Sequence, residues 1–556
     1  MRNILEKSLQ KGMDCVGAAV FFGCWSAKKS ISYNSFSDDL WFEGMACLNV
    51  GKQALCGRDG MSGPVRDLLY KMALKEQQVL LKTVKLYSIT TDGWTDATGA
   101  HMATLTVHWI DESFCHKSTV ACVCYLAAQN SDAIVHFLES ELQEILPSGI
   151  LCSIVQDNAS VCKKVGRELV GSVDSVGCSA HLAHLIVTDE AIKKSQFGEA
   201  VRKMHSVVLE VKYGKLAKKL EALQEKPLSL VISVVTRWNS MLAEISRFLD
   251  QRVLPHLIDI WKTEKTQSLF PDGDELHCLR AMVTVLEAFR LFTAEVSKED
   301  TVLAQVPDLV WDLEDKLTEF KCDPNYFVKS FAELLLPLVR NRFGSFVEVN
   351  TSLEHSYVPL SILSAAVLPG ANLARRLTVE QISFVRQAVA EEFADLHQQL
   401  KGGSSSKTRR NLVTESVELL WEALRTPVSS AQSVLHFYRR VFCDPQASLN
   451  PAESCLNDCQ NFVFDSLRAL LCTPASSAAS ERAFSSAGFL QDGRESFNKE
   501  NFEKALMIRN LALNSDIPKI RALLDEVRKE VAPVPTVVSA PASTTATSSA
   551  PAVFLP

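Results

Sequence analysis

The chain has 556 residues, a hydrophobic fraction of 47% and a formal net charge of −7. This length exceeds that of a single ordinary domain and predicts about two to four folding units. The negative charge argues against a globally basic nucleic-acid-binding protein, although it leaves room for a local basic groove.

The 16 cysteines are scattered and include no Cys-x-x-Cys pair. A chain of this size does not need disulfides, so we expect reduced thiols and an intracellular compartment. Residues 1–29 mimic a signal peptide, but Glu6 and Asp14 lie among the bases, which favours an amphipathic or buried helix. No apolar run reaches the ~18 residues of a membrane span, so no membrane partner is expected.

After residues 1–75, which read as short helices and loops, the pattern changes to strands. KLYSITTD, MATLTVHWI and STVACVCYL have the length and β-branched composition of strands. A helical apolar repeat from Ile134 to Ile145 follows, then ILCSIVQD as a strand and NASVCKKVGRELV as a helix. This order predicts an α/β layer with a partly antiparallel sheet over residues 80–195.

The rest of the chain is predicted to be mainly helical. Residues 196–440 carry few strand signals and contain a flexible, basic interruption, GGSSSKTRR. Residues 441–531 are helical as well. The tail, residues 532–556, is rich in Pro, Ala, Ser and Thr and is expected to be disordered.

Two aspartates end predicted strands of the α/β layer. Asp92 ends KLYSITTD and Asp157 ends ILCSIVQD. The carboxyl ends of strands are where open α/β sheets present chemistry, and Gly93 and Asn158 would let the backbone turn after each acid. Taken singly, each aspartate is better explained as a cap of the next turn or helix, and only two such acids together with a third on a later helix favour a shared site.

A third acid, Glu481, lies among small residues in ASSAASERAFSSAG, residues 475–488. Small neighbours would let its helix pack closely on a sheet. Three carboxylates from separate elements can hold two divalent ions about 4 Å apart, and Mg²⁺ and Mn²⁺ prefer oxygen ligands. The alternative is a glutamate that is stabilised near a helix N-terminus by the helix dipole.

Several blocks occur in an order that resembles the hAT superfamily of transposases, and especially their domesticated BED-finger relatives. The blocks are TTDGWTD, VQDNAS, CSAHLAHL, TRWNS, PASSAASERAFSSAG and RESFNKENFEKALMIRN. The resemblance implies an RNase H-like mixed sheet core that begins in residues 80–195. It also implies a long helical insertion domain over 196–440, and closing helices with a dimerisation region over 441–531.

The resemblance further assigns roles to residues of these blocks. Asp92, Asp157 and Glu481 would form the acidic triad, binding Mg²⁺ or Mn²⁺ if the protein is active. The dimerisation surface would include an apolar set in the C-terminal region. That set is Phe484, Phe497, Leu506, Ile508 and Leu511.

Two further blocks are expected near DNA. Cys178 and His181 match the family's Cys-x-x-His pair, and we expect them to organise the site or contact DNA. A zinc site with His184 is the alternative, but it lacks an obvious fourth ligand. Arg237 and Trp238 match a position near the cleavage site, where the indole could stack on an unpaired base. Without the resemblance, Trp238 would read as a core residue at a helix start.

The chain departs from the family pattern before the core. No cysteine and histidine spacing typical of a BED zinc finger occurs there, so the finger is lost, encoded elsewhere or truncated from this sequence. Two functions therefore stay open for a protein expected in the nucleus. One is a metal-dependent DNA nuclease and strand transferase. The other is a catalytically silent, dimerising regulator of transcription that associates with DNA or chromatin.

Overall fold

A computed structural model describes residues 65–401, 463–483 and 499–531, together with isolated positions 20, 24, 27, 63, 418, 420, 421 and 424. Short gaps interrupt the first range at 96–98, 127, 129, 170–173, 194, 215, 234–237, 265, 267 and 353–355. The contacts divide the chain into two compact units, one of residues 77–506 and one that joins residues 1–76 to 507–556.

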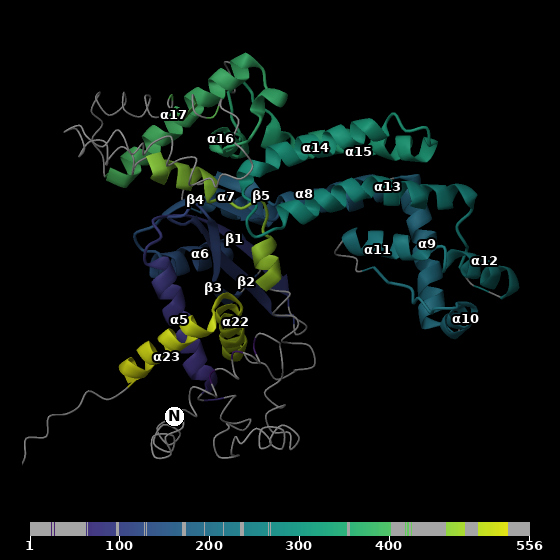
Figure 1. The fold of residues 1–556 in the computed structure, drawn as a ribbon, viewed down its shortest axis with the longest axis horizontal. Helices are drawn as coiled ribbons and strands as arrows, with labels where there is room; N and C mark the ends of the chain where they lie inside the picture. The colour runs from purple at the N-terminus through teal and green to yellow at the C-terminus, as the bar shows by residue number, and fades with distance from the viewer. Residues whose placement is uncertain are drawn as a thin grey trace, which may run out of the picture. The chain divides into compact units, whose positions relative to one another are not determined.

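A five-stranded mixed sheet lies at the centre of the larger unit (Figure 1). Its strands are β1 (Leu86–Thr95), β2 (His101–Ile110), β3 (His116–Leu126), β4 (Ile150–Gln156) and β5 (Asp174–Gly177). The order across the sheet is β3-β2-β1-β4-β5. β2 pairs antiparallel with β1 and β3, whereas β4 is parallel to β1 and β5. The prediction of a partly antiparallel α/β layer is confirmed.

One face of the sheet is apolar. Alternate strand residues, among them Ile89, Leu105 and Ile154, are fully buried in one hydrophobic cluster. The cluster is closed by α6 (Ser131–Ile145) and α7 (Ser160–Glu168). Side chains of a strand alternate between the two faces, so the residues before and after each of these point to the opposite face.

The opposite face carries hydroxyl groups in place of hydrocarbon near β1, β2 and β4. Ser88, Thr90, Thr106 and Ser153 are all fully buried or nearly so. Their register partners show that they share this face, since Ser88 pairs with Ser153 and Thr90 with Thr106. Buried hydroxyl groups need hydrogen-bond partners, so this face requires a polar or close-packed cover.

Helices dominate the rest of the larger unit. Those between the sheet and residue 401 are α8 (Ser179–Leu185), α9 (Gln196–Tyr213), α10 (Leu216–Leu223), α11 (Trp238–Phe248), α12 (Leu254–Thr263), α13 (Gly273–Val296), α14 (Val306–Phe320), α15 (Tyr326–Val347), α16 (Leu360–Val367) and α17 (Val379–Lys401). A π-helical segment, Ile186–Ile192, continues α8, and short 3₁₀ turns are Leu303–Gln305 and Leu373–Arg375. Fully buried aromatic side chains such as Phe289 and Phe331 fill the core of α8 to α15, whereas the buried residues of α16 and α17 belong to a separate cluster.

The smaller unit contains part of α5 (Arg66–Leu81), part of α22 (Lys499–Asn514) and all of α23 (Ile517–Val531). Its core includes Leu69, Met72, Ile508 and Leu524, each almost fully buried. The sequence predicts one C-terminal region over 441–531, whereas the contacts group residues after 506 with the N-terminal segment. Among the described helices, none combines the length and hydrophobicity of a bilayer span.

Candidate active site

Asp92 lies on the hydroxyl face, within β1 instead of at its end. The β1–β4 pairing ends at Thr90, but the pairing with β2 continues to Thr95, so Gly93 stays in the strand opposite Ala103. The predicted turn at Gly93 is therefore wrong, because the antiparallel ladder keeps the backbone extended. The Gly93 N–H donates a hydrogen bond to Asp92 Oδ1 at 2.8 Å.

Asp157 follows β4 directly, as the sequence predicts. Strand alternation from Ser153 through Val155 gives Asp157 the same side of the sheet as Asp92. Its Oδ2 lies 3.4 Å from Nδ1 of His181, a residue of α8. The structure thus brings one residue of the predicted Cys-x-x-His pair to one of the predicted acids.

The segment that carries Glu481 packs on the hydroxyl face. Thr473 Oγ1 lies 2.7 Å from Ser153 Oγ and 3.2 Å from Ser88 Oγ. Ser480, the residue before Glu481, places its Oγ 2.9 Å from Thr90 Oγ1. Residues 478–483 are helical, and the small side chains of this stretch let the backbone approach the strands. Thr473 therefore joins this segment to β1 and β4.

The three carboxylates influence one another electrostatically. The pKa of Asp92 is raised to about 7, first by burial and then by the negative charges of Asp157 and Glu481. The hydrogen bond from Gly93 acts in the opposite direction. Burial away from water accounts for most of this shift, and the charges of Asp157 and Glu481, two acids from distant parts of the sequence, add to it.

The donor set suits a hard divalent cation. In the part of the chain that the structure describes, no three His, Cys, Asp or Glu side chains stand ready-made to enclose a metal ion. The charges of Asp157 and Glu481 nevertheless act on Asp92, and a cation bound near these acids would offset that repulsion. Carboxylate oxygens are also the ligands that Mg²⁺ and Mn²⁺ prefer. Their role as metal ligands and catalysts stays a prediction.

The side chain of Cys178 is buried and holds two segments of the chain together. Its side chain is fully buried, and its Sγ accepts the N–H of His181 at 3.5 Å and that of Ser477 at 3.4 Å. Burial raises the pKa of this thiol to about 11, which disfavours the thiolate that zinc would require. The predicted DNA contact by Cys178 does not fit this burial. The geometry fits the organising role, because the sulfur joins α8 to the segment of Glu481.

Trp238 is the first residue of α11 and is only 3% exposed. Its ring packs edge-to-face against Phe289 with centroids 6.4 Å apart. The prediction that Trp238 stacks on an unpaired base does not fit this position, because the indole is already enclosed by the insertion helices. The predicted alternative, a core tryptophan at a helix start, describes what is observed. Arg237 lies outside the described residues.

The predicted dimerisation residues that the structure describes are buried within the chain. Leu506 packs with Met102 and Phe502 in the larger unit. Ile508 and Leu511 belong to the core of the smaller unit, and all three side chains are at most 3% exposed. Phe484 and Phe497 lie outside the described residues. Leu506, Ile508 and Leu511 are therefore not exposed for contact with a second copy of the chain.

The hydroxyl layer was not recognised as part of the site from the sequence. It consists of Ser88, Thr90, Ser153, Thr473 and Ser480. The signal was present in β1 and β2, where serine and threonine alternate with large apolar residues. Its meaning depends on a cover that comes from a segment far along the chain, so strand periodicity alone could not reveal it.

Comparisons with known proteins add no relatives to this description. No protein-family model matches the chain, and no curated protein matches it.

Proposed function

We propose that the chain carries an RNase H-like site of the hAT transposase type, which cleaves DNA phosphodiester bonds with Mg²⁺ or Mn²⁺. The observation that supports this proposal is that Asp92 and Asp157 lie on one face of the sheet, on which the segment of Glu481 packs through the Ser480–Thr90 contact. The charges of Asp157 and Glu481 also raise the pKa of Asp92. Carboxylates that have only a structural role are normally kept apart from one another. Sites of metal-dependent phosphoryl transfer bring several carboxylates together.

The chain's own residues would act as follows. Asp92, Asp157 and Glu481 would hold the metal ions, and His181 would orient the Asp157 carboxylate. When bound there, the ions would activate the attacking oxygen and stabilise the leaving oxygen of the phosphodiester. Ligating carboxylates must be deprotonated, so cleavage should rise as the pH increases through about 7, where Asp92 titrates.

Metal-dependent nicking of supercoiled plasmid tests the proposal. The parent chain should nick DNA with Mn²⁺ or Mg²⁺, and Asp157→Asn should lower the rate by about three orders of magnitude or more. Glu112→Gln, which changes an exposed acid in the loop between β2 and β3, is the matched control and should cleave like the parent. Nicking that survives Asp157→Asn would reject the assignment.

A catalytically silent regulator that binds DNA or chromatin in the nucleus is the other outcome of this assay. It would show as DNA binding by the parent without nicking under any divalent ion. Dimerisation through residues 441–531 belongs to both forms of the proposal, and it would use side chains other than Leu506, Ile508 and Leu511, which are buried within the chain. A monomer in light scattering at micromolar concentration would contradict it.

A further inference from the structure

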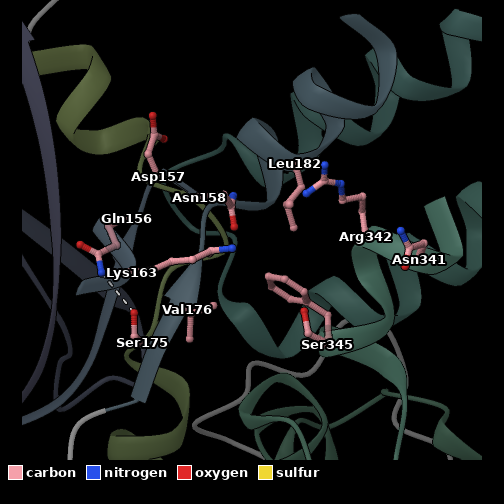
Figure 2. Close-up of a pocket in the computed structure, with 12 residues that line it drawn as sticks. Gln156, Asp157, Asn158, Lys163, Ser175, Val176, Leu182, Asn341, Arg342 and Ser345 are labelled. Carbon is pink, nitrogen blue, oxygen red and sulfur yellow. Dashed lines mark hydrogen bonds between the residues drawn. The ribbon is translucent and has the colours of Figure 1, made fainter. Parts of the chain in front are cut away.

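A polar hollow of about 360 Å³ lies beside the candidate active site. It is formed where the carboxyl end of β4 meets β5, α7, α8 and the insertion helix α15 (Figure 2). Asp157 lines it, but its carboxylate points away from the centre in Figure 2, whereas Lys163 and Asn158 point inward. The Asp157 carboxylate therefore points to one side of the β4 end, whereas the side-chain nitrogens of Asn158 and Lys163 point to the other, into the hollow.

The wall of this hollow is partly apolar. Leu182 and Phe346 line it and are only 4% and 5% exposed, so both side chains are anchored in the core of the insertion helices. Asn158 is held by a hydrogen bond from Nδ2 to the carbonyl of Cys178 at 3.3 Å. Gly177 permits that position, because a Cβ there would lie 2.1 Å from Asn158 Oδ1.

The two positively charged side chains that line the hollow, Arg342 and Lys163, differ in their ion pairing. Arg342 Nε donates to Glu190 Oε1 at 2.7 Å, so its charge is partly neutralised. Lys163 is exposed, and no ion-pair partner is recorded for its ammonium group among the described residues. The neighbouring Lys164, by contrast, lies 3.1 Å from Asp132 and 3.3 Å from Glu168. Lys163 is thus the lysine of this helix that is available for an anion.

We propose that this hollow binds one nucleotide of a DNA strand, next to the bond that is cleaved at Asp157. Lys163 and Asn158 would take the phosphate, while Leu182 and Phe346 would contact the sugar and base. Small-molecule sites begin at about 300 Å³, so the volume of this hollow, about 360 Å³, suits a ligand of the size of a single nucleotide. Apolar contact combined with a phosphate-binding base is the usual composition of single-strand sites. This inference rests on the proposed function.

Binding of a labelled single-stranded oligodeoxynucleotide to the full chain, measured by fluorescence anisotropy in EDTA, tests the proposal. Lys163→Ala should weaken binding by about fivefold or more and should reduce the slope of log affinity against log salt by about 0.7. Lys164→Ala, its matched control, should stay within about twofold of the parent. Equal effects of the two substitutions would overturn the proposal.

Filling the hollow provides a second variant that does not remove a charge. Ser345→Trp, on α15 at the rim, should also weaken binding by about fivefold while thermal unfolding shows that the chain remains folded. Deoxyadenosine monophosphate should compete with the oligonucleotide, whereas competition by inorganic phosphate alone would overturn the nucleotide assignment. Preference for RNA over DNA of the same sequence would overturn it as well.

The outcome separates this inference from the proposed function. Binding that depends on Lys163 in a protein that never nicks DNA would leave the nucleotide site intact and reject the nuclease. Nicking that depends on Asp157, together with binding that ignores Lys163, would reject the nucleotide site alone.

Discussion

The two faces of the central sheet are packed by different chemistry, although alternate residues of the same strands build them. Ile89 and Leu105 belong to a face that is sealed by hydrocarbon from α6 and α7. Thr90 and Ser153 belong to a face that is covered by the segment carrying Glu481 through hydroxyl contacts. Hydrocarbon packing is non-directional, whereas hydrogen bonds fix distance and orientation.

This difference suggests a division of labour between the faces. Burial of a large aliphatic side chain contributes more to stability than a net intramolecular hydrogen bond does. We therefore expect the apolar face to stabilise the sheet and the hydroxyl face to set the position of Glu481. Substitutions of neighbouring residues in β1 can separate the two contributions.

The largest effect on stability is expected on the apolar face. Ile89→Ala should lower the free energy of unfolding by about 3 kcal/mol, because it removes a fully buried side chain and leaves a cavity. Urea denaturation followed by circular dichroism measures this change. Ile89→Val, which removes one methylene group, should cost about 1 kcal/mol. A loss below that of Ile89→Val would show that this face is not the main source of stability.

A smaller effect of opposite sign is expected at Asp92. Its folded pKa of about 7 lies above the unfolded value, so the folded state binds the extra proton between about pH 4 and 7 and loses stability as the pH rises through that window. The full shift would correspond to about 4 kcal/mol, but Asp92 is partly exposed and solvent screens the interaction. Asp92→Asn should therefore be more stable than the parent by about 2 kcal/mol at pH 8 and nearly equal at pH 4.

Buried His108 on the same sheet also makes stability depend on pH, so the stability of Asp92→Asn must be compared with that of the parent at each pH. Burial lowers the pKa of His108, so its contribution to stability is lost as the pH falls below the unfolded value. That effect is common to Asp92→Asn and the parent and cancels in their difference. Glu112→Gln should show no pH-dependent gain. A gain by Asp92→Asn that persists at pH 4 would contradict the raised pKa.

The smallest loss of stability is expected on the hydroxyl face. Thr90→Val removes the group that bonds His108 Nε2 at 3.0 Å and Ser480 Oγ at 2.9 Å, and should cost about 1 kcal/mol. If the hydroxyl layer positions Glu481, this variant should lose about tenfold in nicking rate, since small misplacements are costly. Thr90→Ser keeps the hydroxyl and should retain most activity. Full activity of Thr90→Val would contradict the positioning role.

The strands β1 to β4 and their succession along the chain follow from local patterns in the sequence. Strand-length β-branched runs predicted β1 to β4, and the apolar repeat near Phe137 predicted α6. Asp92 was placed at a strand end because Gly93 suggested a turn. Whether a glycine turns or stays extended depends on the pairing of the next strand, which local sequence does not encode.

The residues alone make Glu481 a candidate third carboxylate, but its assignment to one triad with Asp92 and Asp157 follows from the resemblance of sequence blocks. Periodicity reports which face of an element is buried, but it does not say which distant segment covers that face. The same limit explains Trp238, whose indole contacts Phe289 of another helix. It also explains Cys178, whose sulfur is occupied by an N–H from Ser477. In each case a long-range partner determines the role of the side chain.

The most direct test is Mn²⁺ binding, followed by electron paramagnetic resonance of the free ion. If the three acids form one site, Asp92→Asn, Asp157→Asn and Glu481→Gln should each weaken Mn²⁺ binding by at least about tenfold. Glu112→Gln should bind Mn²⁺ like the parent. Affinity that is unchanged in Glu481→Gln would show that the late segment contributes no ligand and would contradict the account.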